Sequence, residues 1–593
     1  MAPRNLTDLP PELLDHITTY LPTAQSVARL GKSCRDLHTY VEKDAWHTFS
    51  RTRFPSIYSA GAGTQASHRH DARTLTTLSK AWDRRAFVAS YLEPHGDIRA
   101  FPGDRRLERW KRPRGQTIGF LPQLDCYEEI SNPSGTRKEI LAFSAGAEIC
   151  LRERSINTAT GDDARWMTYR PLSAVEGRDD VTCMHLVRPQ EGDDPQQGRT
   201  LVTGTANGDL QLLQLPPDDG SPAVKTYFPT QGRDVRSTSV LQKPFNSSLL
   251  AANLGESHLC VYSVDQNAEK IPAFTEIDVR PQMSNGRRNQ RIWSTNFLSS
   301  TNLAIGLGPS EEPLHIYALS PSGLTKEPIR KFGLRDGMDN KRTSSTYPVV
   351  PLPPATTASG SGDGQVFLSG AYDGIIRLHD LRSSRDFESI YTDPTEDGSI
   401  YSLLPRGRES LVAGTSRHSL LKVFDLRLGS KAYSYLGDQP PDDQQTGKIE
   451  RTKDYSLFIT PQAATYPGRG GGNNWARRSA ESSVYSLTSP SPNSPYIYAG
   501  VENAIVAMAF TSLLDAHPDP TYFRPLRGEN DASKGTIGGM RVKDIFDLAM
   551  YDQTADMTLH KQRSVWETVR SSAGLRRGEG TLDGLDERWK IGS

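Results

Sequence analysis

Cysteine is scarce in this chain, and the few cysteines are not spaced for a metal site. The five among 593 residues are Cys34, Cys126, Cys150, Cys183 and Cys260. None belongs to a C-x-x-C pair, and their number is odd. A disulfide framework or a zinc finger is therefore not expected, and a reducing compartment is favoured.

Long hydrophobic runs and a net charge are also lacking. No run approaches the roughly 18 apolar residues that a membrane-spanning helix needs, and the N-terminus lacks the apolar core of a signal peptide. We therefore predict no membrane association, and we expect the protein in the cytoplasm, the nucleus or both. Lys and Arg total 70 and balance 70 Asp and Glu residues. This balance argues against a dedicated nucleic-acid binder, which is usually strongly basic.

Catalytic signatures are missing as well. The run Gly470–Gly472 lacks the Lys-Ser/Thr of a phosphate-binding loop, and no G-x-S-x-G elbow is present. His68 and His70 lie in a polar stretch without a companion ligand, so solvated histidines are favoured over a metal site. We predict no catalytic residue, no metal and no cofactor. The basic run between Arg105 and Arg114 is interpreted as a solvated linker rather than a nuclear import signal.

Glycine and proline are abundant instead, with 49 and 40 residues, more than the usual ~12% together. Such residues mark turns and favour many short strands over long helices. The length indicates two or more domains, or one large closed architecture with small attachments.

The first 50 residues predict a small helical module. Asp8 can cap a helix with prolines in its first turn, Thr23 a second, Ser33 a third and Asp44 a fourth. The apolar positions are Leu13, Leu14, Ile17, Tyr20 and Leu21, then Val27 and Leu30, then Cys34, Leu37 and Val41, then Trp46 and Phe49. Four short helices cannot bury all of these faces alone, which indicates a partner surface.

The segment LPPELLDHITTYLPTAQSVARLGKSCRDLHTYVEKDAWHTF resembles an F-box. The residues that match the family pattern are Leu9, Pro10, Glu12, Ile17, Leu21, Cys34 and Trp46. The resemblance implies docking on the Skp adaptor of cullin–RING (SCF) ubiquitin ligases. The adaptor contacts that it implies are Leu9, Pro10, Leu13, Ile17, Leu21, Val27 and Leu30. The alternative for any one of them is packing inside the module only, which is the expectation for Leu14 and Leu37.

A bridge follows this module. Residues 55–73 are rich in Ser, Ala, Gly and His and predict a loop. Residues 74–92 predict a helix that sets the spacing to the next domain, with buried positions at Leu75, Leu78, Trp82, Phe87, Val88 and Leu92.

A repeated hairpin pattern sets the architecture of the remainder. Seven copies begin at Ile140, Thr200, Leu249, Asn302, Val366, Leu411 and Tyr496, each an apolar run, a turn and a second alternating run. A short element of the form β-branched–variable–Ser/Cys precedes most copies. Repetition of a three-strand core plus an outer strand predicts a seven-bladed β-propeller.

The repeats resemble WD repeats. In the best copy Asp373-Gly374 supplies the turn and His379-Asp380 stands at the Trp-Asp position, as Phe424-Asp425 does in the next copy. The Gly-His dipeptide and the Trp are missing throughout, so the family's His–Ser–Asp–Trp network cannot be complete.

The expected organisation is a small all-α F-box at 5–54, a loop and helical linker at 55–114, an all-β WD-repeat-like propeller at 115–560 with an insertion at about 429–480, and a loose tail at 561–593. Residues 115–130 or 542–553 are the candidates for strands that close the ring.

The resemblance to WD repeats places the variable residue of the short element on one face of the propeller. The candidate mouth residues are Thr182, Arg236, Trp293, Tyr401 and Tyr485, flanked by Asp234 and Arg291, with Tyr372 and Glu502 beside the turns. We predict substrate binding by Arg236, Arg291, Trp293, Tyr372, Tyr401 and Tyr485, because aromatic and Arg residues dominate interface energies. The expected ligand is a peptide, including a phosphorylated or acidic one. The alternative is that the aromatic residues wedge between blades as core.

The two resemblances together predict a non-catalytic substrate receptor. The F-box would bind the Skp adaptor and, through it, the cullin and RING subunits, while the propeller holds a protein substrate for ubiquitylation. The alternative is an F-box and WD-repeat scaffold outside ubiquitin ligation. A propeller enzyme would need clustered titratable groups in the channel, for which the sequence offers no support.

Overall fold

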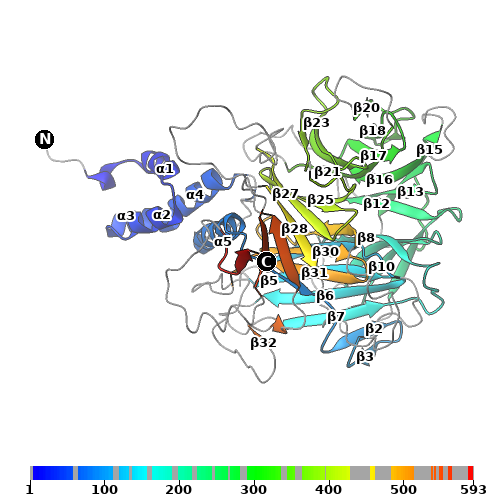
Figure 1. Cartoon of the computed structure of the whole chain (residues 1–593), viewed down its shortest axis with the longest axis horizontal. Helices are drawn as coiled ribbons and strands as arrows, with labels where there is room; N and C mark the ends of the chain where they lie inside the picture. The colour runs from blue at the N-terminus through cyan, green and yellow to red at the C-terminus, as the bar shows by residue number, and fades with distance from the viewer. Residues whose placement is uncertain are drawn as a thin grey trace.

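The computed structural model consists of a helical module and a large β-structure (Figure 1). It describes residues 5–55, 57, 65–110, 119–131, 136–156, 163–189, 198–216, 223–242, 248–264, 268–280, 290–334, 343–353, 364–393, 395–427, 454–460, 482–512, 536–537, 540–541, 546–551, 558–563 and 585–591. The structure confirms a helical N-terminal region followed by an all-β propeller.

The N-terminal helices differ from the expected four in one respect. The elements are η1 (Leu6–Asp8), α1 (Pro11–Thr19), α2 (Ala24–Gly31), α3 (Arg35–Tyr40), the π turn η2 (Val41–Ala45) and α4 (Trp46–Arg53). The last three run on without a break, so Asp44 caps no helix. The continuous helix buries Leu37, Val41, Ala45 and Phe49 at successive turns, and this burial favours continuing the helix over ending it.

One of the four expected caps is found. Thr23 caps α2 as predicted, because its Oγ1 accepts a hydrogen bond from the backbone N–H of Ser26 at 3.2 Å. Besides Asp44, neither Asp8 nor Ser33 is the N-cap of a helix, although Asp8 completes the capping box of η1. Asp8 accepts from the N–H of Asn5, and Ser33 Oγ donates to the carbonyl of Leu30. The residues at the N-caps of α1 and α3 are Pro10 and Cys34.

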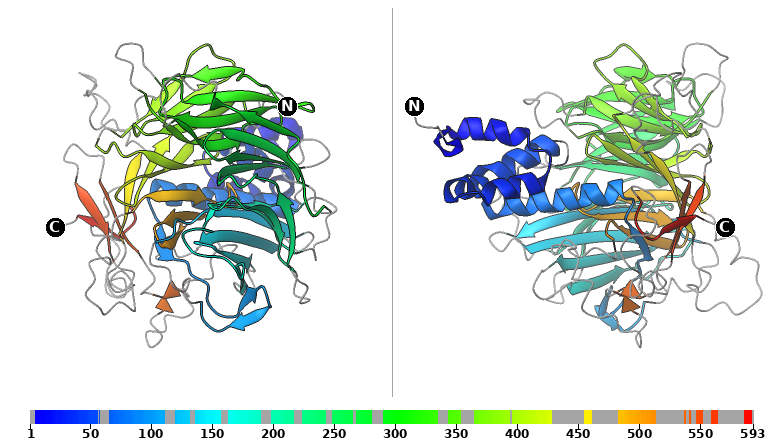
Figure 2. Two further views of the ribbon diagram at one scale, coloured as in Figure 1. Left: turned by 90° about the vertical axis from the view of Figure 1, so that its right-hand side faces the viewer. Right: turned by 60° about the vertical axis from the view of Figure 1, so that its left-hand side comes forward.

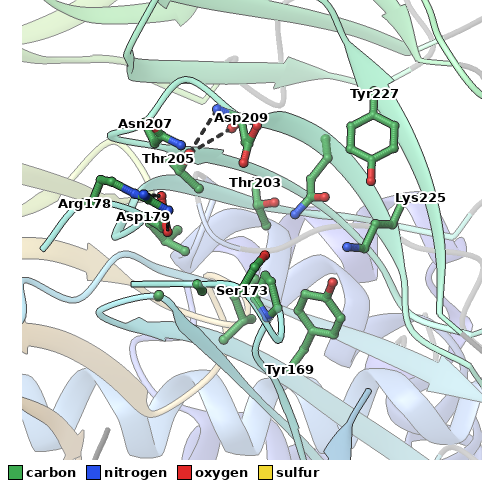
Figure 3. A pocket seen from close by; sticks show the side chains of 16 residues that line it. Tyr169, Ser173, Arg178, Asp179, Thr203, Thr205, Asn207, Asp209, Lys225 and Tyr227 are labelled. Carbon is green, nitrogen blue, oxygen red and sulfur yellow. Dashed lines mark hydrogen bonds and ion pairs between the residues drawn. The ribbon is translucent and has the colours of Figure 1, made fainter. Parts of the chain in front are cut away.

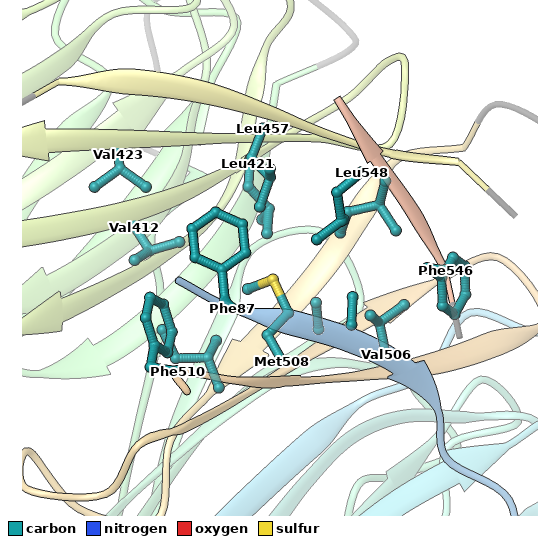
Figure 4. Packing of buried hydrophobic residues seen from close by; sticks show 14 of the residues in the cluster. Phe87, Val412, Leu421, Val423, Leu457, Val506, Met508, Phe510, Phe546 and Leu548 are labelled. Atoms are coloured by element: carbon teal, nitrogen blue, oxygen red, sulfur yellow. The ribbon is translucent and has the colours of Figure 1, made fainter. Parts of the chain in front are cut away.

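The helix α5 (Gln65–Asp83) joins the module to the propeller (Figure 2). Near its start, Ala72 packs into the core of the module. Near its end, Trp82 stacks on Phe510 with ring centroids 4.2 Å apart. The same cluster of buried residues contains Leu78 and residues from several strands (Figure 4). The α5 helix therefore contributes to both hydrophobic cores.

The predicted helix at 74–92 ends at Asp83, nine residues early. Arg85 has a positive φ of 51°, and residues Val88–Tyr91 form the strand β1. This strand pairs antiparallel with β31 (Ala504–Ala509), with Val88 opposite Ala509. Val88 and Ala89 are buried there, so pairing on a sheet edge outweighs the helical pattern of the local sequence.

Six sheets are built around antiparallel strands that follow one another along the chain. The first two contain β4 (Leu124–Ser131), β5 (Thr136–Ala145), β6 (Glu148–Ile156) and β7 (Asp163–Tyr169), then β8 (Val181–Val187), β9 (Thr200–Thr205), β10 (Leu210–Gln214) and β11 (Val224–Phe228). The next two contain β12 (Val235–Leu241), β13 (Ser248–Leu254), β14 (His258–Val264) and β15 (Thr275–Asp278), then β16 (Arg291–Phe297), β17 (Asn302–Gly308), β18 (Leu314–Ser320) and β20 (Arg330–Phe332). The last two contain β21 (Thr346–Pro351), β22 (Val366–Ala371), β23 (Ile376–Asp380) and β24 (Ser389–Tyr391), then β25 (Ile400–Arg406), β26 (Ser410–Thr415), β27 (Leu420–Asp425) and β28 (Tyr455–Thr460).

One further sheet combines a strand that precedes these six sheets in sequence with three strands that follow them. It contains β29 (Val484–Thr488), β30 (Tyr496–Val501) and β31, with β1 from the N-terminal side as its outer strand. The inner strands β4, β8, β12, β16, β21, β25 and β29 contact one another in this order, and β29 contacts β4. The sheets therefore form a closed ring around a common axis.

The strand that completes the last sheet is not one of the two segments expected to close the ring. Within residues 115–130, β4 is an inner strand. Within residues 542–553, β34 (Asp547–Tyr551) pairs with β28. The closing strand is β1, which lies in the segment expected to be a linker. Additional strands are β2 (Ile98–Phe101), β3 (Arg105–Leu107), β19 (Gly323–Leu324), β32 (Thr536–Ile537), β33 (Met540–Arg541), β35 (Leu559–Gln562) and β36 (Trp589–Ile591).

Segments expected to be loose contribute to this structure where it describes them. In the expected insertion, β28 is a regular strand, and the rest of that insertion lies outside the described residues. In the expected tail, β36 pairs with β35. Trp589 is buried, and its Nε1 donates a hydrogen bond to the carbonyl of Arg85 at 2.8 Å. The C-terminal segment thereby holds the turn between α5 and β1.

Candidate functional site

The first candidate surface lies on α1 and the turn before it. On this helix Pro10, Leu13, Ile17 and Tyr20 recur every three or four residues and share one face. Leu13 and Tyr20 are 49% and 71% exposed. The opposite face of α1 buries Leu14 against the module core. We call Leu6, Pro10, Leu13, Ile17 and Tyr20 the α1 surface.

The structure divides the seven predicted adaptor contacts into three groups. Pro10 and Leu13 are exposed and Ile17 is half-buried. Leu9, Leu21 and Leu30 are partly buried and pack against the module core. Val27 is completely buried and supports α2 from within the module core. Its role as an adaptor contact stays a prediction.

Two exposed apolar residues were missing from the predicted set. Tyr20 belonged to the apolar stripe of the first helix but was not assigned a contact, and Leu6 was not considered. Leu6 is 40% exposed in η1, beside α1. The signal that could have found Tyr20 is its spacing of seven residues from Leu13 on the same helical face.

The second candidate surface follows the inner strands of the propeller. Six of these strands carry a β-bulge near their start. The extra residue is the variable residue of the predicted pattern, namely Thr182, Arg236, Trp293, Tyr401 and Tyr485, and in β21 it falls at Tyr347 and Pro348. A bulge leaves a residue out of the ladder and redirects its side chain. The recurring pattern therefore marks a recurring backbone irregularity.

Four of these side chains form a continuous aromatic arc. Trp293 and Tyr347 meet edge to face with ring centroids 4.9 Å apart, and Tyr347 meets Tyr401 at 5.3 Å. Tyr401 stacks with Tyr485 at 6.1 Å. Burial raises the pKa of Tyr347 to about 12, and burial also raises the pKa of Tyr485. All four remain half-buried. They come from four neighbouring inner strands, so each ring contact joins two adjacent sheets.

Two arginines extend this arc at its Trp293 end. The guanidinium carbon of Arg291 lies 3.6 Å from the centroid of the Trp293 ring. Burial and the nearby Arg236 both lower the pKa of Arg291. Arg236 forms an ion pair with Asp234 at 2.8 Å. The indole N–H of Trp293 is buried without a hydrogen-bond partner among the residues described here. We call Arg236, Arg291, Trp293, Tyr347, Tyr401 and Tyr485 the mouth cluster.

The other predicted mouth residues differ in their roles. Tyr372 is 63% exposed at a turn, and its carbonyl accepts a hydrogen bond from Ser399. Thr182 uses its hydroxyl to bond the carbonyl of Val235 in the next sheet. Thr182 is therefore a structural link between sheets. Tyr347 was missing from the prediction, because Pro348 stands where the other copies have Ser or Cys.

One buried pair of residues lies in the copy that most resembles a WD repeat in sequence. His379 is fully buried at the position of the family's Trp. Its Nδ1 lies 2.7 Å from the carbonyl of Asp386, and its Nε2 lies 2.8 Å from Ser369 Oγ. Because a carbonyl only accepts, Nδ1 carries the proton and Nε2 accepts from Ser369. Burial lowers the pKa of His379 to about 3.

His68 and His70 lie on α5 rather than in a loop, and the His68 ring contacts that of His47 with centroids 5.0 Å apart. In the part of the chain that the structure describes, no three His, Cys, Asp or Glu residues are grouped to hold a metal. No described helix has the length and apolar character to cross a membrane.

The comparisons with known proteins support the helical module. A family model described as F-box-like matches residues 6–52. No curated protein matches the chain. Among solved structures, the chain is similar to that titled "Crystal structure of Chaetomium thermophilum Raptor", with a TM-score of 0.41 and 12% sequence identity. That match covers 82% of this chain and 39% of the Raptor chain. The chain thus carries an F-box-like domain at its N-terminus and a propeller behind it.

Proposed function

We propose that this chain is the substrate-recognition subunit of an SCF-type ubiquitin ligase. In this proposal the F-box-like module docks on the Skp adaptor, which brings the cullin and RING subunits, and the propeller binds a protein substrate. The chain catalyses no bond chemistry. It acts by raising the local concentration of the substrate near the ubiquitin-charged enzyme, in the cytoplasm or the nucleus.

The observation that carries this proposal is the α1 surface on a module that matches the F-box-like family. Exposed apolar side chains on one face of a helix cost free energy unless a partner covers them. Leu13 and Tyr20 present such a face, while the core behind them is complete.

We also infer that the propeller has seven blades of the WD-repeat type. Six sheets of successive strands and the sheet of β1 with β29–β31 support this count. The Ser369–His379 pair and the turn at Asp373-Gly374 support the WD-repeat assignment, although no blade contains the family's Trp at that place.

The mouth cluster is the proposed substrate site. Trp, Tyr and Arg are the residues that contribute most to protein interfaces, and the aromatic arc presents them on adjacent strands. The unpaired indole N–H of Trp293 supplies a donor for a peptide carbonyl. An acidic or phosphorylated peptide would gain further from Arg291 and Arg236.

Adaptor docking is tested by a quantitative pull-down of the full chain with purified Skp adaptor. We expect the double variant Leu13→Asp/Tyr20→Asp to bind at least tenfold more weakly, because charges replace apolar anchors at the centre of the surface. The matched control is Leu172→Asp, since Leu172 is 92% exposed on the propeller. Equal binding by the double variant and the control would show that docking does not use the α1 surface.

Substrate binding is tested by affinity purification and mass spectrometry with the variant Trp293→Ala/Tyr401→Ala. We expect this variant to keep the adaptor and lose the substrate, whereas Tyr551→Ala, a partly exposed tyrosine on β34, keeps both. An unchanged set of bound proteins would contradict the mouth assignment. If loss of the chain stabilises no protein in cells, the scaffold alternative replaces the receptor.

A further inference from the structure

A polar cavity of about 310 Å³ lies between the first two sheets (Figure 3). One wall comes from β9, β10 and β11, and the other from Ile149 and Tyr169 of the preceding sheet. The loop from Pro171 to Asp179 forms part of its rim. This cavity is separate from the mouth cluster, whose residues do not line it.

Strand pairing explains why polar groups gather on one wall. Thr203 on β9 lies opposite Gln211 on β10, and Gln211 lies opposite Tyr227 on β11. Directly opposed residues project on the same face of a sheet. Lys225 precedes Tyr227 by two residues and shares that face. The wall therefore carries two hydroxyls, one amide and one ammonium group in adjacent positions.

Thr203 is the unexplained member of this wall. Its side chain is 1% exposed, and its Oγ1 has no hydrogen-bond partner among the described residues. Leaving a buried hydroxyl unpaired is costly, and such a group in a native structure calls for an explanation. Thr203 lines the cavity, so a ligand there can supply the missing partner.

Lys225 provides the positive charge. Its Nζ lies 5.4 Å from the centroid of the Tyr169 ring. Burial is the largest single effect and lowers the pKa of Lys225. The hydrogen bond with Tyr169 and the electrostatic interactions with Tyr169, Tyr227 and Asp209 together outweigh it, and the net pKa is raised. Lys225 is therefore protonated at neutral pH. No carboxylate of the described part of the chain forms an ion pair with it.

The remaining charges limit the ligand to a single negative charge. Arg178 is already paired with Asp179 at 2.9 Å, and the exposed Asp209 also lines the cavity. These two carboxylates would repel a dianion such as a phosphate monoester. A carboxylate group meets one ammonium and neutral donors without this penalty.

The loop that borders the cavity adds an apolar component. Pro171, Ser173 and Ala174 of this loop line the cavity. Leu172 and Val175 do not line it, but they adjoin these residues in sequence and are 92% and 52% exposed. Such apolar surface near a polar cavity suits a polar group carried on a larger, partly apolar ligand.

We propose that this cavity binds a carboxylate, with Lys225 supplying the opposite charge and Thr203, Gln211 and Tyr227 donating hydrogen bonds. The carboxylate is carried by a glutamate in a partner peptide or by a small organic acid. The proposal does not depend on adaptor docking, because the cavity lies wholly within the propeller.

The two sources are distinguished by titrating the full chain with two probes. One is the peptide acetyl-Leu-Glu-Leu-amide, with acetyl-Leu-Gln-Leu-amide as its neutral counterpart. The other is butyrate, a small acid with one negative charge. Both are measured by calorimetry. Binding of the Glu peptide at least tenfold tighter than the Gln peptide indicates a peptide site. Binding of butyrate with no gain from the peptide indicates a small acid.

Two variants test the residues. We expect Lys225→Met to weaken binding of the preferred probe at least tenfold, and Lys331→Met, an exposed lysine on β20, to leave it unchanged. Thr203→Val has nearly the same shape and removes the unpaired hydroxyl. It should weaken binding while its melting temperature stays equal to or above that of the wild type. A residue with only a structural role would not give this combination.

The proposal is overturned if neither probe binds, or if the Glu and Gln peptides bind equally and butyrate does not bind. It is also overturned if Lys225→Met binds the preferred probe as tightly as Lys331→Met. None of these results bears on adaptor docking, which the pull-down measures separately.

Discussion

His379 combines burial with a titratable ring, which makes the stability of its sheet depend on pH. An unfolded chain protonates His near pH 6.5, whereas burial lowers the pKa of His379 to about 3 in the fold. Between these values the unfolded state binds a proton that the folded residue does not. The free energy of unfolding therefore falls as the pH falls from 6.5 towards 3.

Replacing His379 by Gln removes this proton uptake. We expect the dependence of unfolding free energy on pH to become shallower, by up to about 1.4 kcal/mol per pH unit. The measurement is urea denaturation at several values between pH 7 and pH 4.5. A residual slope remains in the variant, because burial also lowers the pKa of His315, to about 4. An unchanged slope in His379→Gln would contradict the assignment of His379 as a neutral buried ring.

Single residues were predictable where their type and spacing repeat. The β-branched–variable–Ser/Cys element located Arg236, Trp293, Tyr401 and Tyr485, because each copy forms the same bulge. The reason for the pattern lies beyond sequence spacing. Ser402 donates to the carbonyl of Val484 in the next sheet. Pro348 cannot repeat that bond, and Tyr347 was missed for this reason.

Two glycines beside the bulged inner strands have a role in packing that the sequence pattern does not show. A Cβ on Gly414 would lie 2.7 Å from Val484 Cβ, and one on Gly306 would lie 2.6 Å from the carbonyl oxygen of Thr346. Each glycine lets the inner strand of the next sheet approach. The hairpin pattern shows these residues as turn-like, whereas they lie within strands.

At the scale of elements, α5 decides how firmly the F-box-like module is held. Its first half contacts the module through Ala72 and its second half contacts the propeller through Trp82. Near its start Asp71 also lies 3.6 Å from Arg137 of β5. A helix anchored at both ends transmits a fixed spacing, in contrast to a flexible linker.

We therefore predict that Trp82→Ala loosens the module. The distance between the module and the propeller is measured between two spin labels, one on Cys34 and one on Arg382→Cys. Cys34 can be labelled selectively, because it is exposed while the other four cysteines are buried. The distance distribution should broaden in Trp82→Ala, because its stacking on Phe510 is lost. Arg69→Ala is the control, since its exposed ion pair with Glu42 contributes little. Equal widths in both variants would contradict an anchored linker.

The helix–strand switch at residues 84–88 illustrates what local sequence omits. Apolar spacing predicted one helix to Leu92, and the apolar positions Leu78, Phe87 and Val88 are indeed buried. Burial was predictable from hydrophobicity. The strand that pairs with β1 was not predictable, because it is β31, which lies near the other end of the chain.

At the scale of the whole molecule, closure depends on contacts between the two ends of the chain. Trp589 packs against Phe87 with centroids 5.8 Å apart and bonds the carbonyl of Arg85. Arg588 donates to the carbonyl of Thr511 and to the buried Asp586. The sequence predicts a loose tail at 561–593, where Gly, Arg and Ser recur, and these few buried residues are too short a signal to detect.

We predict that Trp589→Ala lowers the free energy of unfolding by about 3 kcal/mol, through the cavity left and the lost hydrogen bond. The matched control is Ile591→Ala, because Ile591 is 62% exposed two residues away on the same strand. Chemical denaturation, followed by far-UV circular dichroism because this signal does not depend on one tryptophan, measures the free energy of unfolding of both variants. A change no larger than that of the control would show that the C-terminal segment does not hold the ring closed.

The pairing of β1 with β31 also has a consequence for synthesis on the ribosome. Val88 leaves the ribosome early, but its partner Ala509 is made only after the strands β4 to β28. Until then β1 has an open edge and an apolar face without a partner, a state that favours aggregation. This sheet therefore forms late in translation, and a chain cut short before β31 exposes two incomplete edges for quality control to recognise.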